Sequence, residues 1–164
     1  DSIKGKGRSR VWRPKEDKVS ISIGETQVSY IWNEIDSTHI AADSGFINDK
    51  FRLLIPFQLV WDTSATISNP VVAKSLIKNE DLNMITVLYG KEGGYTPGDA
   101  YDIYYDENYM IKEWVFRKGN AVEPSLTNTF ENYKDFNGNN IAIDHKMGDQ
   151  NWNLNFADVS ITLD

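Results

Sequence analysis

Cysteine is absent from the sequence of 164 residues, and histidine occurs only twice. Without cysteine the chain can form no disulfide, thiolate metal site or cysteine nucleophile. His39 and His145 are too few and too scattered in sequence for a recognisable zinc site or catalytic triad. We therefore expect no metal and no cofactor in this protein.

Long apolar runs are missing as well, and none approaches the roughly 20 residues that a membrane-spanning helix needs. The sequence also lacks a G-x-S-x-G nucleophile motif and a phosphate-binding glycine loop. Asp102, Glu113 and Glu131 lie on predicted strands, where they could pair as acid and base only inside a cleft. Charged residues on a strand more often face solvent. We interpret the protein as non-catalytic, with a carboxylate-based hydrolase as the weaker alternative.

Two segments rich in Asp and Asn raise the question of calcium binding. They are DENY at 106–109 and DFNGNN at 135–140. Neither has the ligand spacing of an EF-hand loop. Both fit hairpin turns better, because Asp, Asn and Gly tolerate the backbone angles of such turns.

Charge is unevenly distributed along the chain. The first 18 residues carry seven Lys or Arg against three Asp or Glu, a net +4, whereas the whole sequence carries −7. A basic arm can bind nucleic acid or anionic lipid. Here the arm leads into VWRPKEDKVSISI, where the basic residues alternate as on the solvent face or the guarded edge of a strand. Because the acidic remainder repels phosphates, we expect no nucleic-acid binding.

Apolar and polar residues alternate over most of the chain, which predicts strands. KVSISI, the turn Gly24-Glu25 and TQVSYIWN together predict a hairpin. Further strands are predicted at residues 71–77, 83–89, 99–105, 109–117, 125–134, 139–147 and 151–163. Their short connections require antiparallel neighbours. The predicted fold is an all-β meander in one domain spanning residues 1–164.

The last predicted strand changes its buried face. Its apolar residues lie at even positions up to 156 and at odd positions from 159 onwards. A bulge at Ala157-Asp158 would produce this change, as would a strand that is covered on different faces along its length. Both occur in strongly curved sheets, so we expect a curved, half-open barrel.

The segment GFINDKFRLLIPFQLVWD at 45–62 is the main break in the β pattern. Apolar residues at 47, 51, 54 and 55 form the stripe of an amphipathic helix, and Asp43 and Ser44 are candidate N-caps. Pro56 cannot continue a helix and favours an extended Ile55. The pattern predicts a short helix confined mainly to 40–56 and then a short extended segment with Phe57, Leu59 and Trp61 on one side.

Four segments resemble one family: RVWRPKEDKVSI, GFINDKFRLLIPFQLVWD, GDAYDIYYDENYMIKEWVFRKG and TFENYKDFNGNNIAIDHK. In strand order and aromatic placement the chain is similar to bacterial envelope proteins related to the periplasmic lipoprotein-localisation carriers. The resemblance implies a curved antiparallel half-barrel whose concave face is covered by helices, with an apolar cavity for acyl chains. It also implies a location in the periplasm or cell envelope, and an envelope lipoprotein as a partner. Such carriers begin with a helix, whereas strands are predicted almost from the start of this sequence, so we expect either a truncated chain or a less completely covered cavity.

The abundant aromatic residues either fill a core or line such a cavity. The curved sheet and the apolar segment at 45–62 favour a cavity, since ligand sites are mostly apolar hollows with few polar groups. We expect this segment to cover a hydrophobic small molecule or an acyl chain. An exposed apolar patch for a protein partner is the alternative. The predicted ligand-binding residues are Phe51, Leu54, Phe57, Trp61, Trp114, Phe116, Trp152 and Phe156.

Overall fold

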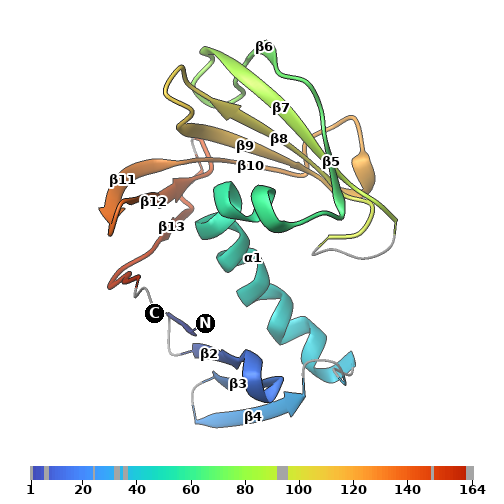
Figure 1. Cartoon of the computed structure of the whole chain (residues 1–164), viewed down its shortest axis with the longest axis vertical. Coiled ribbons are helices and arrows are strands. Elements are labelled where there is room, and N and C mark those ends of the chain that lie inside the picture. Colours follow the sequence, from blue (N-terminus) through green and yellow to red (C-terminus); the bar gives the residue numbers. More distant parts are fainter. Residues whose placement is uncertain are drawn as a thin grey trace. The chain divides into compact units, whose positions relative to one another are not determined.

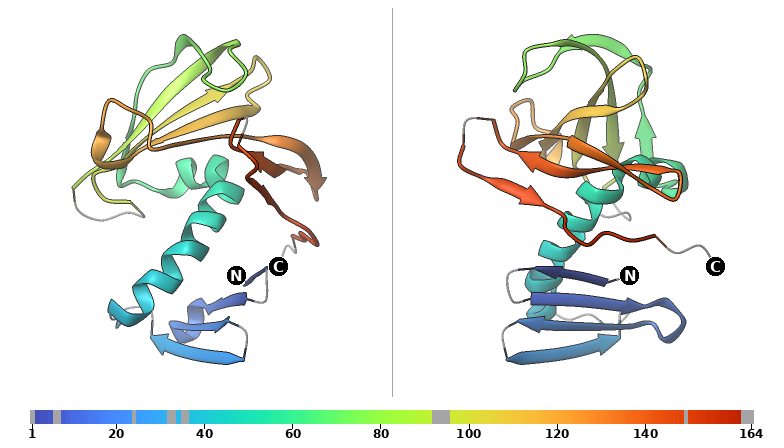
Figure 2. Two further views of the ribbon diagram at one scale, coloured as in Figure 1. Left: turned by 180° about the vertical axis from the view of Figure 1, so that it is seen from behind. Right: turned by 90° about the vertical axis from the view of Figure 1, so that its left-hand side faces the viewer.

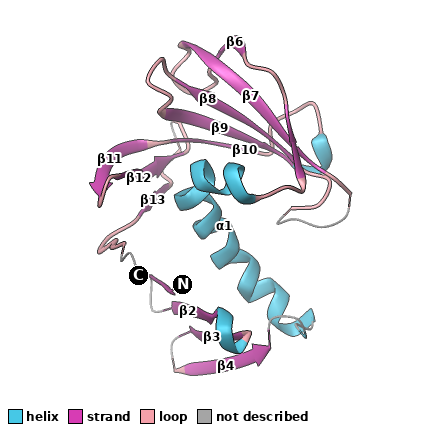
Figure 3. Ribbon diagram, viewed as in Figure 1, coloured by secondary structure: helices cyan, strands magenta, loops and turns pink. Residues whose placement is uncertain are grey.

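Antiparallel strands dominate the protein, together with one long α-helix in the described part of the chain (Figure 3). The computed structural model describes residues 2–5, 8–23, 25–31, 34, 37–91, 96–148 and 150–161. Within these residues the strands form sheets of four, six and three strands, and none of these sheets closes into a barrel. The predicted all-β class with minor helix is therefore confirmed.

The chain divides into two compact units, Asp1–Arg52 and Leu53–Asp164. The first unit contains a short 3-10 helix η1 (Pro14–Glu16) and a four-stranded sheet, whose strands are β1 (Ser2–Gly5), β2 (Arg8–Arg13), β3 (Lys18–Ile23) and β4 (Thr26–Ile31). The predicted hairpin is confirmed, because β3 and β4 pair antiparallel with Val19 opposite Tyr30, and both side chains are buried. The single domain 1–164 stays a prediction.

Helix α1 (Ser37–Trp61) has 25 residues and belongs to both units (Figure 1). The prediction of a short helix ending before Pro56 was wrong, and so was the extended segment after it. Pro56 lies inside α1, although a proline inside a helix removes one hydrogen bond. The helix continues because its buried side extends past the proline, with Ile55 and Gln58 almost fully buried. The proposed N-caps Asp43 and Ser44 also lie inside α1.

The second unit is built on a six-stranded antiparallel sheet. Strands β7 to β10 form the predicted meander, and β5 and β6 both pair with the outer edge of β7. Between β5 and β6 the Ser68 side chain accepts the Thr86 N–H at 2.9 Å, so the ladder continues across the break. The strands are β5 (Ala65–Ile67), β6 (Val71–Lys74), β7 (Asp81–Tyr89), β8 (Ala100–Tyr105), β9 (Ile111–Arg117) and β10 (Leu126–Thr129).

A three-stranded sheet continues from β10. The predicted strand 125–134 is in fact two strands, β10 and β11 (Glu131–Phe136), separated at the buried Phe130. Strand β10 pairs with β9, and β11 pairs with β12 (Asn139–Lys146). Figure 2 shows this second hairpin bending away from the larger sheet. His145 Nδ1 lies 3.0 Å from the Thr129 carbonyl oxygen, which joins β12 to the end of β10.

The last strand is shorter than predicted. Strand β13 covers only Asn153–Asn155, where it pairs with β12. The change of buried face is nevertheless present, since the more buried residues are at even positions up to 156 and at 159 and 161 afterwards. Asp158 has a φ of 54°, so the change occurs at a bend in the chain after the strand, and not at a bulge within it.

Candidate functional site

A row of aromatic side chains crosses one face of the second unit's sheets. The Tyr101 ring is stacked on Trp114 with a centroid distance of 5.0 Å and lies 5.2 Å from Phe116. Trp114 contacts Phe130 edge to face, and Phe130 contacts His145 in the same way. The Trp114 indole N–H also donates to the Asn128 side-chain oxygen. The row is therefore a packed core, in which the Trp114 indole N–H has a hydrogen-bond acceptor.

Three of the predicted ligand-binding residues belong to this row. Trp114 is buried, Phe116 is half-buried beside Tyr101, and Phe156 contacts the His145 ring at 5.7 Å. The structure thus brings them into one connected aromatic cluster. Their contact with a ligand stays a prediction.

The other predicted residues lie elsewhere. Leu54 and Phe57 are half-buried on the part of α1 that belongs to the second unit, and Phe51 is buried on the part that belongs to the first. The side chain of Trp61 lies outside the described part of the chain. Trp152 is half-buried just before β13, in the turn that connects β12 with β13.

The opposite face of the six-stranded sheet carries charged residues with fixed partners. Arg117 donates to both carboxylate oxygens of Asp102 at 2.9 and 3.1 Å, and the Thr86 hydroxyl donates to the same carboxylate at 2.6 Å. Burial and the negative charges of Asp102 and Glu113 raise the pKa of Tyr104 above its ordinary value of 10.0. Asp102, singled out in the sequence as a possible acid or base, is held in an ion pair.

Glu113 is fully buried on this face and binds backbone, not a second carboxylate. Its two carboxylate oxygens accept the N–H groups of Ile77 and Lys78 at 2.9 and 2.7 Å. Both donors are backbone groups, so the two hydrogen bonds connect one short stretch of main chain to β9. Glu113 therefore fixes the segment between β6 and β7 against the sheet.

Glu131, the third carboxylate singled out in the sequence, lies between two lysines. The Lys146 ammonium donates to it at 2.6 Å, and the Lys78 ammonium lies 3.7 Å away. The Lys146 hydrogen bond is the main reason why the pKa of Glu131 is below its usual value. Each of the three carboxylates thus has its own partners.

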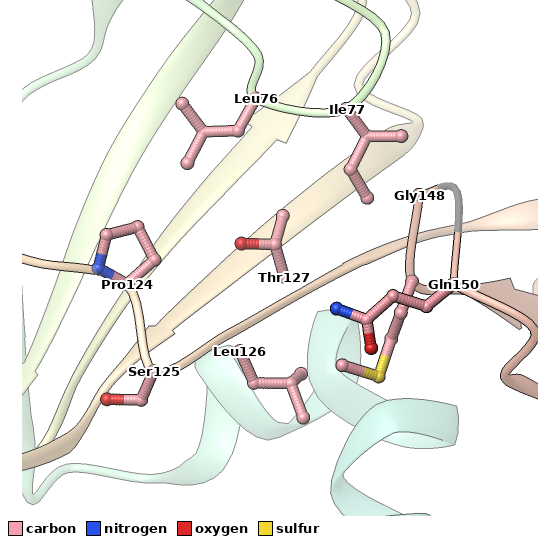
Figure 4. Close-up of a pocket in the computed structure, with 9 residues that line it drawn as sticks. Leu76, Ile77, Pro124, Ser125, Leu126, Thr127, Gly148 and Gln150 are labelled. Atoms are coloured by element: carbon pink, nitrogen blue, oxygen red, sulfur yellow. The ribbon is translucent and has the colours of Figure 1, made fainter.

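An open pocket of about 600 Å³ lies at the edge of strand β10 (Figure 4). Three segments build it: the connection between β6 and β7, the segment entering β10, and the turn between β12 and β13. Five of its lining residues are apolar and three carry polar side chains. The lining residues are Leu76, Ile77, Pro124, Ser125, Leu126, Thr127, Met147, Gly148 and Gln150.

Hydrogen bonds hold the walls of this pocket in place. Glu113 anchors Ile77 through its backbone N–H, and the buried Ser75 accepts the Glu80 N–H and donates its own N–H to the Glu80 carbonyl. On the other side, Gln150 N–H donates to the Met147 carbonyl at 3.0 Å. The two walls approach each other closely, because a Cβ on Gly148 would lie 3.9 Å from the Ile77 side chain. The pocket is therefore preformed.

The floor of the pocket offers backbone polar groups. Phe130 N–H donates to the Lys112 carbonyl of β9, and in an antiparallel pair every second residue bonds to the same neighbour. By this alternation Thr127 directs its N–H and C=O away from β9. On that side of β10, the described hydrogen bonds with β12 are those of Thr129. A ligand in the pocket can thus reach both an N–H and a C=O group of the edge strand.

None of the residues that line this pocket is among the ligand-binding residues predicted from the sequence. Leu76 and Ile77 were assigned to a strand at 71–77, but β6 ends at Lys74. A usable signal was present, since two large apolar residues directly precede the polar turn KNED. Met147 and Gln150 carry no such signal, because only the folding of the β12–β13 turn brings them to the pocket.

Comparison of the chain with models of known protein families, with curated proteins and with solved structures finds no significant match. In the described part of the chain, no helix is long and apolar enough to cross a membrane. The same residues contain no group of three or more His, Asp or Glu side chains placed to hold a metal ion.

Proposed function

We propose that the protein is a non-catalytic binding protein, and that it holds a hydrophobic or amphiphilic small molecule in the pocket at the edge of β10. The pocket itself is the observation that carries this proposal. Its volume of about 600 Å³ lies in the usual range for small-molecule sites, which combine apolar walls with a few polar groups.

The lining residues favour a ligand with an apolar body and one polar group. Leu76, Ile77 and Met147 provide apolar contacts from two walls, whereas Gln150 and the edge of β10 at Thr127 provide hydrogen-bonding groups. An acyl chain with its carboxyl or ester end fits this chemistry. A location in the bacterial envelope, with a lipoprotein as partner, rests on the sequence resemblance.

The separate partners of the three carboxylates favour a binding protein over a hydrolase. A general acid and base must lie together in a cleft with separated pKa values. Asp102 instead pairs with Arg117, Glu113 with backbone N–H groups, and Glu131 with Lys146. None of the three lines the pocket.

The test is a titration with an environment-sensitive fluorescent fatty acid. Leu76 lines the pocket and is 53% exposed, so Leu76→Asp should fold normally. We expect it to weaken probe binding at least about tenfold, because the acyl chain loses an apolar contact worth about 0.8 kcal/mol per methylene and meets a charge. Val122→Asp is the matched control, since Val122 is 89% exposed and lies outside the pocket lining.

A third variant separates this pocket from the site predicted by the sequence. Leu54→Gln changes the half-buried α1 residue and leaves the pocket lining intact. Loss of probe binding in Leu54→Gln alone, in a protein that circular dichroism shows to be folded, would place the ligand at the helix and refute the pocket. Absence of saturable binding in the wild type would refute the function itself.

A further inference from the structure

Tyr109 has a backbone conformation that its side chain disfavours. Seven non-glycine residues of the described chain have a positive φ, and six of them are Asn or Asp. These short polar residues tolerate the left-handed region because they form local hydrogen bonds. Tyr109, with a φ of 61°, is the exception. A bulky residue in this region is an outlier that requires an explanation.

The turn that contains Tyr109 is firmly held. Asp106 Oδ1 accepts the N–H groups of Asn108 and Met110 at 2.9 and 3.0 Å, and its carbonyl accepts the Tyr109 N–H at 3.0 Å. The Lys112 ammonium binds the other carboxylate oxygen at 2.9 Å. Glycine is the usual left-handed residue in hairpin loops of this kind. The turn would therefore form more readily with glycine at position 109.

Burial does not explain the tyrosine, because its side chain is 82% exposed. Its ring is instead stacked on Tyr105, with centroids 6.0 Å apart and planes inclined by 16°. Tyr105 follows a second irregularity, since Tyr104 pairs with Glu113 but Tyr105 pairs with Ile111, which leaves Lys112 as an extra residue. Bulges of this kind re-aim side chains and are frequent beside functional sites.

We propose that the stacked pair Tyr105–Tyr109 is a docking site for a cationic side chain, arginine or lysine, of a protein partner. A tyrosine ring attracts a cation over its face, and Tyr109 presents one face to solvent. Charge complementarity supports a cationic partner. Glu107 in the same turn is exposed, Asp106 is already paired with Lys112, and the whole chain carries −7. This site is separate from the pocket at β10, which shares none of these residues.

The experiment compares two peptides by nuclear magnetic resonance titration of the full chain. One is a glycine–arginine repeat, and the other replaces each arginine by citrulline, its neutral isostere. We expect the arginine peptide to shift the signals of residues 105–110 saturably, and the citrulline peptide to leave them unchanged. Equal binding of both peptides would overturn the proposal, as would shifts spread over the acidic surface without saturation at the turn.

Three substitutions of one residue make the test specific. Tyr109→Phe keeps the ring and should retain binding, whereas Tyr109→Leu keeps an apolar side chain without a ring and should lose it. Tyr109→Gly should lose binding and also raise the melting temperature by about 2–4 °C, because glycine adopts a positive φ without strain. Val122→Ala, at another exposed position, should change neither quantity.

Two results would contradict the proposal directly. Wild-type affinity in Tyr109→Leu or Tyr109→Gly would show that the ring does not bind the cation. A melting temperature of Tyr109→Gly at or below that of the wild type would show that tyrosine costs the fold nothing at this position, which removes the reason to assign it a function.

Discussion

The two faces of the six-stranded sheet are held by different forces. One face carries Tyr101 and Trp114, whose rings pack against each other and against Phe130. The other carries Asp102 and Glu113, whose carboxylates bind specific donors at 2.6–3.1 Å. Register places the two sets on opposite sides, because Ile103 faces Trp114 across the strands whereas Tyr104 faces Glu113.

The two faces therefore have different roles: one stabilises the sheet, and the other positions a particular loop. Apolar burial is non-directional, so it holds the sheet together without orienting a particular loop. Hydrogen bonds to a buried carboxylate are directional, and those of Glu113 orient Ile77, which is a wall of the pocket. We therefore expect substitutions on the aromatic face to change mainly the stability of the fold, and substitutions on the polar face to change ligand binding as well.

The largest effect is expected for Trp114→Ala. Removing a fully packed indole costs about 3–5 kcal/mol of unfolding free energy, because neighbouring rings cannot fill the cavity, and Trp114 is 3% exposed. The measurement is urea denaturation followed by circular dichroism. Trp114→Phe, which keeps an aromatic ring, is the control. A loss below about 1 kcal/mol would mean that the aromatic row is loosely packed and accessible to a ligand, as the sequence predicted.

Glu113→Gln should reduce the stability of the fold less than Trp114→Ala does. It should also weaken ligand binding. The amide offers one acceptor oxygen in place of two, so either Ile77 or Lys78 loses its partner. We expect a loss of about 1–3 kcal/mol in unfolding free energy. Affinity for the fatty-acid probe should also fall, since the pocket wall is no longer fixed. Unchanged affinity in the folded variant would show that the wall holds its position without this anchor.

The smallest effect is expected for Asp62→Asn, just after α1. Burial raises the pKa of Asp62, but hydrogen bonds from Ser64, Gln58 and Tyr89 to its carboxylate hold the pKa below its ordinary value of 3.8. Because the pKa is lowered in the folded state, the ionised carboxylate stabilises the fold fully at pH values above the ordinary pKa of 3.8. This stabilisation is lost as the pH falls through the folded pKa. Because Asp62 is partly exposed, we expect a loss of about 0.5–1 kcal/mol at pH 7.

The pH dependence of the stability of Asp62→Asn tests whether the ionised carboxylate is the stabilising form. Thermal unfolding of both proteins between pH 7 and pH 2 should show the stability difference shrinking below the ordinary pKa of 3.8. A difference that stays constant over this range would show that the asparagine loses packing and not a charge-assisted bond.

The strands were largely predictable, because alternation is a local property. The meander from β7 to β10 follows directly from period-two segments and short connections. The break at Phe130 was not predictable, because the segment TNTFENY contains no Gly or Pro that would indicate the end of a strand. Phe130 leaves the strand because its ring is buried between Trp114 and His145, which come from two different sheets.

The helix shows the same limit. Local rules end it before Pro56, and only tertiary burial explains why it reaches Trp61. The residue that extends the buried side is Gln58, a polar residue that a hydrophobic pattern does not count, although it is 3% exposed. Its amide donates to Asp62 at 3.2 Å, which compensates part of the cost of burying it.

The sequence by itself determined the β class, the positions of most strands and the chemistry of the turns, because backbone preferences and two-residue alternation act between near neighbours. Asn137 and Gly138 illustrate this, as both adopt the positive φ that their residue types allow. The tertiary structure alone decided which apolar residues became core and which became pocket. That choice depends on contacts between segments as distant as Ile77 and Gly148, and burial over such separations leaves no periodic trace in the sequence.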